Sequence, residues 1–550
     1  MAAHEAVRNR DSGSTAGEGA TLILYGGSIV TLDARIEGAT AIAVRGERVL
    51  AVGDDATMLA LAHRGTERIP LEGRTVIPGL IESHAHLLGL GLVRQDLDLR
   101  SLTKSREAIL GAVRERAAVV PRGQWIRGFG WDQNQWEGRE LPTLAELSQA
   151  APHNPVYLSR IDGHAAWVNA AALTATGVGP DSIAPRGGRV EMTRDGRLQG
   201  IFVDQATQLI TAKMPPRSAA EERAAIALAM QEAARLGITM LHDAGASRRT
   251  IDTLKDLGRE GRLLTRLYVM LDGSDPALLE DYWQRGPELG LYGDRLTIRT
   301  IKLFADGALG SRGAALFEDY NDCPGNRGLL LMDGAAIEAI ARRALDRGFQ
   351  VATHAIGDRA NRIVLDAYEA AFAGDLVRAK QARFRVEHAQ ILQPDDIGRF
   401  ALMGVIASVQ TSHFASDAPW VEARIGASRC RHGAYAWREL LDSGAHLVNG
   451  SDAPIEGLNP MAGLVAAIRR GGFGGEPDGR VSLTREEALR SYTSAGAYAS
   501  FLEAQVGTIS PGKWADLAVL NRNIRTACPE EVLGTRVELT IMGGQVVWSA

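Results

Sequence analysis

The chain has 550 residues, a formal net charge of −5 and 45% hydrophobic residues. These values are typical of a globular protein with a large core and more than one structural unit. The acidic balance argues against a surface for nucleic acid or for an anionic membrane. Cys323, Cys430 and Cys528 are far apart and lack CxxC spacing. This pattern disfavours a disulfide framework or a thiolate metal site and favours a reducing cytoplasm.

After the first 20 residues, the two ends of the chain have similar residue patterns. Residues 1–20 are small and polar and predict a disordered tail. Residues 21–75 and 501–550 both contain short β-rich runs broken by glycine turns. They predict one small β-sandwich domain assembled from both termini, with a separate domain at 76–500 inserted between them. No apolar run reaches the length of a membrane helix, so no membrane partner is expected.

The central region alternates apolar runs with helical stretches such as 335–348. The candidate strands lie at 76–83, 237–243, 265–271, 298–306, 349–354, 383–388, 404–410 and 446–452. Strands alternating with helices predict parallel βαβ units, and eight such units close a (β/α)8 TIM barrel of the α/β class. An open doubly wound sheet is the alternative. Residues 94–225 fit neither pattern and predict a large insertion after strand 1. The glycine-rich stretch 469–480 predicts a mobile surface loop.

A pair of histidines, His84 and His86, follows the first apolar run. Residues i and i+2 of a strand point the same way, so the two imidazoles are expected to converge at the carboxyl end of that strand. Barrel enzymes place their chemistry at this end. Taken alone, the pair indicates either two metal ligands or an ordinary polar strand end.

Further polar residues fall at the same topological level. Lys302 lies inside the fourth predicted strand among apolar neighbours, where a lysine is costly to bury unless it is paired or modified. His354, His388 and Asp452 end the fifth, sixth and eighth strands. Any one of them has a structural explanation, but the whole set at one end of a barrel indicates a metal centre.

This arrangement resembles the amidohydrolase superfamily and, within it, the amidohydrolase-3 family. The similarity extends over residues 20–548 and includes PGLIESHAHLLGLG (78–91), SRIDGHAAWVN (159–169), IKLFADGALGSR (301–312), THAIGD (353–358), HFASDAPW (413–420) and GSDAP (450–454).

The resemblance implies a role for each candidate ligand. His84 and His86 would bind one divalent metal, His354 and His388 a second, and Lys302, carboxylated on Nζ, would bridge the two. Asp452 would ligate the first metal. One or two metal ions are expected, with zinc favoured by imidazole and carboxylate ligands.

The implied reaction is hydrolysis of an amide-type C–N bond other than a peptide bond. Water activated by the metal would attack the carbonyl carbon, with Asp452 as general base and then general acid. N-substituted formamides are the specific hypothesis for the substrate, because deformylases of that kind belong to the family. The partner is thus a small molecule, and family analogy adds a homodimer.

Other residues are weaker candidates for contact with the substrate. His164 in the insertion could reach over the barrel mouth, or it is a structural loop histidine. Asp306 and Arg312 follow strand four and either line the pocket or form a loop ion pair. His413 follows strand seven on the catalytic face.

Several functions remain as alternatives. Carbamates, lactams or esters could replace the amide. A deaminase would typically use one metal, without the lysine and with an HxxE pair near strand five, whereas His354 is followed by Ala-Ile-Gly-Asp. A non-catalytic regulatory homologue should have lost ligands, yet all six are present.

Overall fold

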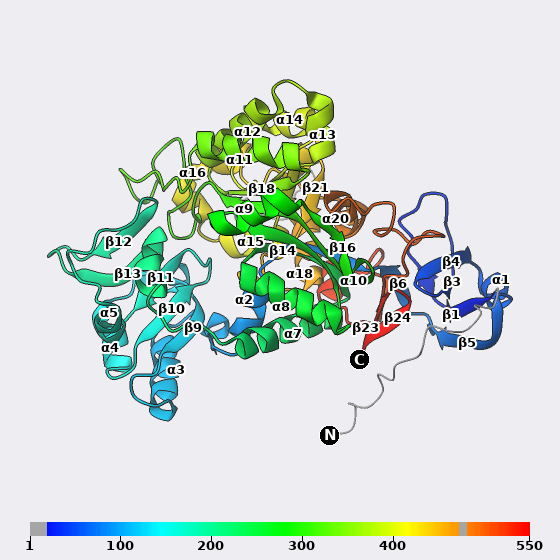
Figure 1. The fold of residues 1–550 in the computed structure, drawn as a ribbon, viewed down its shortest axis with the longest axis horizontal. Helices are drawn as coiled ribbons and strands as arrows, with labels where there is room; N and C mark the ends of the chain where they lie inside the picture. Colours follow the sequence, from blue (N-terminus) through cyan, green and yellow to red (C-terminus); the bar gives the residue numbers. More distant parts are fainter. Residues whose placement is uncertain (1–18, 472–480) are drawn as a thin grey trace.

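The computed structural model describes residues 19–471 and 481–550. The predicted tail therefore lies almost wholly outside the described residues, as does most of the glycine-rich stretch, although Ala20 already begins the first strand. Figure 1 shows the insertion, the barrel and the terminal sheets side by side along the long axis of the molecule. The barrel occupies the middle, so the other two parts lie at opposite ends of it.

The barrel is a nearly closed ring of eight parallel strands in chain order. They are β7 (Leu80–Ala85), β14 (Ile238–Ala246), β15 (Arg266–Asp272), β17 (Leu296–Phe304), β18 (Gln350–Ala355), β19 (Arg385–His388), β20 (Ile406–Val409) and β21 (Leu447–Asn449). A parallel bridge between Ala85 and Ala453 joins the first strand to the chain that follows the last. All eight predicted strands are present, and the predicted (β/α)8 barrel is confirmed.

Helices cover the outside of the barrel (Figure 1). They are α2 (Leu87–Val93), α7 (Ala219–Arg235), α8 (Arg248–Arg259), α9 (Pro276–Arg285), α11 (Gly334–Arg347), α12 (Asp358–Phe372), α13 (Leu376–Ala382), α14 (Pro394–Met403), α15 (Thr411–Asp417), α16 (Val421–His432), α17 (Trp437–Asp442), α18 (Pro460–Ile468), α19 (Arg485–Ser491) and α20 (Ser494–Ala499).

Local sequence explains where these helices begin and end. Ser218 and Glu221 form a reciprocal capping box at the start of α7. Helix α14 starts with Pro394 in its first turn and is followed by Gly404 in the left-handed region at φ 66°. Apolar side chains on one face of each long helix then pack against the strands, as Ile226 and Met230 of α7 do.

The insertion after the first barrel strand forms a mixed sheet with its own core. Its strands, in spatial order, are β12 (Gly188–Met192), β13 (Leu198–Asp204), β11 (Ala165–Val168), β10 (Val156–Arg160), β9 (Ile126–Trp131) and β8 (Leu97–Asp98). The helices α3 (Arg106–Val119), α4 (Leu144–Ala150), α5 (Ala170–Thr176) and α6 (Gln208–Thr211) accompany it. Trp131, Trp136 and Trp167 belong to this core.

Both termini contribute to a pair of packed sheets at the far end of the barrel. One sheet contains β4 (Arg48–Gly53), β3 (Ala41–Arg45), β1 (Ala20–Tyr25) and β5 (Ala62–Pro70), beside the short α1 (Asp55–Leu59). The other contains β2 (Ser28–Ile29), β6 (Thr75–Pro78), β22 (Leu517–Leu520), β23 (Val537–Met542) and β24 (Gln545–Ser549), with α21 (Pro529–Leu533) nearby. One hydrophobic cluster joins the two sheets, as a β-sandwich requires, while the exact domain boundaries remain predictions.

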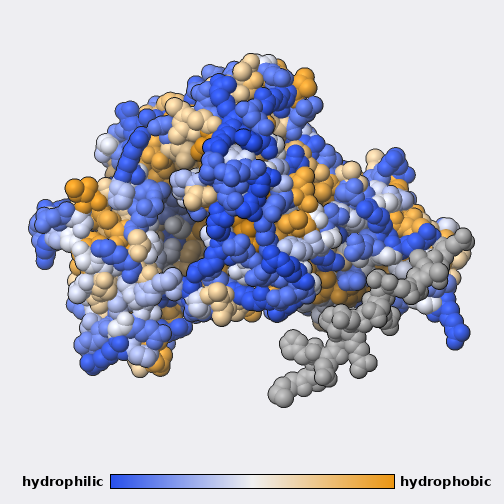
Figure 2. All heavy atoms as spheres, in the orientation of Figure 1, coloured by the Kyte–Doolittle hydropathy of each residue, from blue (hydrophilic) through white to orange (hydrophobic). Residues whose placement is uncertain are grey.

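The face drawn in Figure 2 is largely hydrophilic, with hydrophobic residues in small scattered areas. Across residues 19–471 and 481–550, none of the helices combines the length and the apolarity needed to cross a membrane.

Candidate active site

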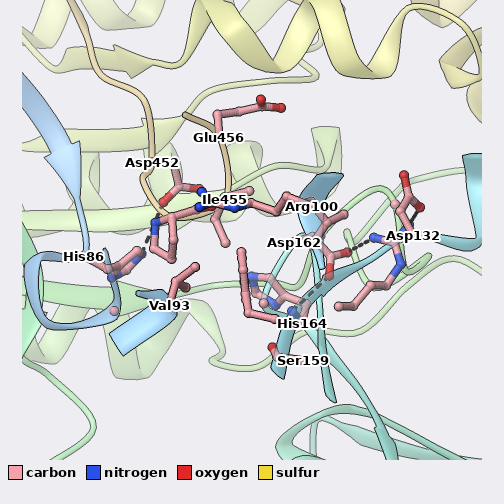
Figure 3. Close-up of a pocket in the computed structure, with 18 of the residues that line it drawn as sticks. His86, Val93, Arg100, Asp132, Ser159, Asp162, His164, Asp452, Ile455 and Glu456 are labelled. Carbon is pink, nitrogen blue, oxygen red and sulfur yellow. Dashed lines mark hydrogen bonds and ion pairs between the residues drawn. The ribbon is translucent and has the colours of Figure 1, made fainter. Parts of the chain in front are cut away.

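A cavity of about 1150 Å³ lies between the carboxyl ends of the barrel strands and the insertion. Residues that follow barrel strands form its floor, and residues of the insertion form the facing wall (Figure 3). His86 and Asp452 lie on one side of this view, and Asp132, Asp162 and His164 lie on the other. A concave site of this size is of the order expected for a small molecule.

The structure brings the six predicted metal ligands together at the floor. Asp452 Oδ1 lies 3.2 Å from Nε2 of His86 and 3.5 Å from Nε2 of His84. Lys302 Nζ also lies 3.5 Å from His84 Nε2. The rings of His354 and His388 are 4.4 Å apart between centroids. All six come from strands or strand ends, as the spacing of the sequence predicts.

Two of these histidines have their outer ring nitrogen occupied. Nδ1 of His84 contacts Oε2 of Glu387, and Nδ1 of His388 lies 2.6 Å from Oε1 of Gln410. Since the outer nitrogen is engaged, Nε2 is the atom left for a ligand. Ligand atoms of His84, His388 and Asp452 all lie within 4.8 Å of one another, a spacing that one metal ion could bridge.

Burial keeps His84, His354 and His388 neutral. It lowers the pKa of His84 to about 4, and the positive charge of Lys302 acts in the same direction. The pKa values of His354 and His388 are also well below the ordinary value, chiefly because of burial. Neutral imidazole is the form that binds metal.

The carboxylate and the amine of the floor are shifted as well. Burial by itself would raise the pKa of Asp452, but the imidazoles around it, led by His86, hold that pKa well below its ordinary value. Burial lowers the pKa of Lys302 to about 8, against the opposing effect of Glu387 and Asp452. The floor thus combines the neutral imidazoles of His84, His354 and His388 with a charged carboxylate and an amine that loses its proton more easily than an ordinary lysine.

The backbone at Asp452 and at the nearby Gly450 restricts which residues can occupy these positions. Asp452 itself has φ 57°, in the left-handed region. A Cβ at Gly450 would come within 2.3 Å of Oε1 of Glu82, which accepts hydrogen bonds from the amides of His84 and Ser451. Only glycine fits at position 450, and this close approach ties the eighth strand end to the first.

A network of buried residues behind the floor was not predicted from the sequence. Arg385 donates to both carboxylate oxygens of Glu387, at 2.7 and 3.0 Å. Burial by itself would raise the pKa of Glu387, but Arg385 and His84 hold it well below its ordinary value. The one available signal was the charged pair Arg385 and Glu387, alternating with Val386 in a strand that is otherwise buried.

Two of the predicted substrate contacts line the cavity. His164 reaches over the barrel mouth, with its ring 5.2 Å from that of His354, and its Nδ1 lies 2.7 Å from Oδ1 of Asp204. His413 stacks parallel to His388 at 6.0 Å between ring centroids. The structure holds no substrate, so their contact with one stays a prediction.

The other two lie elsewhere. Neither Asp306 nor Arg312 is among the described residues that line the cavity. Asp306 is fully buried and accepts hydrogen bonds from the backbone amides of Ala315, Ile356 and Gly357, so it ties the loops after the fourth and fifth strands together. Arg312 pairs with Asp322, at 3.1 and 3.0 Å, and not with Asp306. The carboxylate of Asp306 is thus held by backbone donors, with its Oδ1 also 3.4 Å from Nε2 of His354, and the guanidinium of Arg312 pairs with a different acid.

Comparison with known proteins identifies the class. The family model described as "Amidohydrolase family" matches residues 67–548, and this chain belongs to that family. Family membership supports a hydrolase, and the resemblance predicted from the motifs is confirmed.

Particular relatives agree over nearly the whole chain. The chain is 34% identical to Protein LONG AFTER FAR-RED 3 of Arabidopsis thaliana, over 97% of this chain and 92% of that protein. It is 27% identical to N-substituted formamide deformylase of Arthrobacter pascens, over 95% of this chain and 97% of that protein. A solved structure of an uncharacterized metal-dependent hydrolase from Pyrococcus furiosus matches with 30% identity and a TM-score of 0.72, over 92% of this chain and 100% of the other.

Proposed function

We propose that this protein is a divalent-metal-dependent hydrolase of an amide-type C–N bond, with N-substituted formamides as the first substrate class to test. The observation that carries the proposal is the convergence of donor atoms from His84, His388 and Asp452 within 4.8 Å at the floor of the cavity. The similarity to a formamide deformylase supports the substrate class.

The donor set fits a divalent metal such as zinc. His84 and His388 each present Nε2 because Nδ1 is engaged, and Oδ1 of Asp452 accepts no well-aligned hydrogen bond from the described residues. His86 and His354 complete the set of imidazoles at the same strand ends. Neutral imidazole and carboxylate oxygen are ligands that zinc prefers.

Each residue then has a task in hydrolysis. A divalent metal held by these residues would lower the pKa of water and polarise the substrate carbonyl. Asp452, charged at neutral pH, takes the proton released by the attacking water and returns it to the leaving nitrogen. His164 and His413 lie on the cavity surface beside this point and hold the substrate. Residues of the insertion, among them Asp132, Asp162 and His164, form the opposite side of the cavity.

Lys302 has a separate role in this proposal. The lysine is 1% exposed, and its pKa of about 8 makes the neutral amine accessible near neutral pH. The ammonium first loses one proton, and addition of carbon dioxide to the neutral amine then forms an N–C bond and releases a second proton. The product is a carboxylate, in place of the buried cation, that could ligate a metal. Native mass spectrometry should detect one added carbon dioxide that is lost on acidification and is absent from Lys302→Met.

The activity test measures amine release from N-formyl, N-acetyl and bulkier N-acyl aromatic amines. The zinc-loaded protein is compared with the chelated protein and with His354→Ala. We expect the formyl compounds to react fastest, with loss of turnover on chelation and recovery with zinc. Turnover that is unchanged by chelation and by His354→Ala would contradict the proposal. Absence of turnover would reject simple amides and turn the test to lactams, carbamates and esters.

A further inference from the structure

Two histidines at the floor of the cavity have unequal partners. Nδ1 of His84 faces the carboxylate of Glu387, whereas Nδ1 of His388 faces the amide oxygen of Gln410. Gln410 donates its own Nε2 to the carbonyl of Ser408 at 3.1 Å, which fixes its oxygen toward His388. One ligand is thus held by a charged acceptor and the other by a neutral acceptor.

Arg385 holds the carboxylate of Glu387 through both of its oxygens. Arg385 donates to Oε1 from Nε and to Oε2 from Nη2. Arg385 is itself held by the carbonyl of Ser83 at 2.7 Å, by Ser408 Oγ at 2.8 Å and by His242 Nδ1 at 3.0 Å. Arg385, Glu387 and His84 are all 0% exposed, so solvent neither screens nor replaces these contacts.

We propose that Glu387 is the positioning residue that sets the metal affinity of this centre, by orienting His84 and by making its Nε2 a stronger donor than Nε2 of His388. The inference rests on the proposed metal role of His84. A carboxylate behind a histidine ligand fixes the tautomer and raises the basicity of the ligating nitrogen. Charge-assisted hydrogen bonds are about twice as strong as neutral ones, so Glu387 has a larger effect than Gln410.

The contacts of Glu387 make Glu387→Gln a sensitive test of this inference, because both carboxylate oxygens accept hydrogen bonds from donors. Oε1 accepts from Arg385, and Oε2 accepts from Arg385 and faces His84. Whichever oxygen the amide nitrogen replaces, an N–H group meets a donor. The variant therefore loses either the hold of Arg385 on this side chain or the contact with His84. Loss of the hydrogen-bond partner behind a metal-ligating histidine typically lowers metal affinity by about 10- to 100-fold.

Two further variants make the test specific. Gln410→Met removes the neutral acceptor behind His388 at similar size. We expect a smaller loss of affinity than in the Glu387 variants, because neutral hydrogen bonds are about half as strong as charge-assisted ones. Glu387→Asp keeps the charge opposite Arg385 but shortens the side chain by one methylene, which withdraws it from His84. It covers the case in which Glu387→Gln does not fold, and it should also weaken binding.

The measurement is zinc affinity of the full-length metal-free protein, by competition with a chromophoric chelator. Circular dichroism verifies the fold of each variant. Weaker binding by both Glu387 variants than by Gln410→Met supports the inference. Wild-type affinity in a folded Glu387 variant, or a larger loss in Gln410→Met, would overturn it. If the wild-type protein itself binds no zinc, the proposed function fails and the inference fails with it.

Discussion

The polar groups at the floor of the cavity and those at its wall differ in how fully they are paired. At the wall, the guanidinium of Arg160 is 2% exposed and is engaged by Asp132, Asp162 and Gln133. At the floor, neutral imidazoles and Asp452 face one another with few hydrogen bonds among the described residues. Buried polar groups are normally paired. The wall therefore serves stability and shape, whereas the floor is arranged for something that the chain does not itself supply.

The largest expected effect is at the floor. In the proposed mechanism Asp452→Asn removes both a ligand charge and the proton acceptor, so we expect kcat to fall by about 10³- to 10⁴-fold. Circular dichroism should show an intact fold, because asparagine has nearly the same size as aspartate and also tolerates the left-handed conformation at φ 57°. Asp33→Asn, in the terminal sheets, makes the same chemical change away from the cavity and should keep full activity. A variant Asp452→Asn that retains turnover would break the contrast between the two regions.

At the wall the effect should be on stability. Arg160→Met leaves Asp132 and Asp162 without their cation, and breaking a buried pair costs about 3–5 kcal/mol in the free energy of unfolding. Arg127→Met is the matched control, since Arg127 lines the same cavity but has no ion pair within 4.0 Å to any described residue. It should cost less than about 1 kcal/mol. Equal losses of unfolding free energy in the two variants would show that the ion pairs of Arg160 do not stabilise the wall.

Metal removal sharpens the comparison. A ligand at 100 times its dissociation constant stabilises the folded state by about 2.7 kcal/mol. Chelation should therefore lower the melting temperature, measured by calorimetry, by a similar amount in the wild-type protein and in Arg160→Met. If chelation left the wild-type melting temperature unchanged while zinc bound, the metal would not be held preferentially by the folded floor.

The smallest expected effect comes from Glu456, at the cavity edge. Burial raises its pKa from 4.5 to about 7. The folded state therefore holds this proton in a window where the unfolded state has lost it, and the contribution of Glu456 to stability falls as pH rises from about 4.5 to about 7. Glu456→Gln abolishes that titration. The free energy of unfolding of the variant, taken relative to that of the wild-type protein, should rise by about 1 kcal/mol from about pH 4 to about pH 8. The effect is small because the cavity is partly solvated. An unchanged difference across urea titrations at these two pH values would contradict the assignment.

The sequence was most informative where one residue sits at one strand end. His84, His354, His388 and Asp452 each close an apolar run, so chain order and strand direction place them together. Lys302 was noticeable because an apolar strand makes a lysine costly. The eight barrel strands were predictable for the same reason, since burial on both faces gives continuous apolar runs.

Contacts between distant segments could not be predicted in this way. Asp204 meets His164 where the neighbouring strands β13 and β11 adjoin, in a sheet whose spatial order departs from chain order. Glu387 resembles any polar residue of a strand until His84 is placed against it. Arg312 adopts φ 57° and pairs with Asp322, which depends on a loop conformation that no periodicity reports.

The strand that carries His84 depends on a late part of the chain. Strand β6 leads through Gly79 into β7, the strand of His84, and β6 lies between β2 and β22 in its sheet. Strand β22 (Leu517–Leu520) follows β6 in the chain only after all eight barrel strands. During translation, the first sheet has all its strands early, but β6 lacks one hydrogen-bonding neighbour until the whole barrel has been synthesised. The sheet beside β7 is thereby completed only after the barrel, and a product truncated before Leu517 is left with an open strand edge directly before the strand of His84.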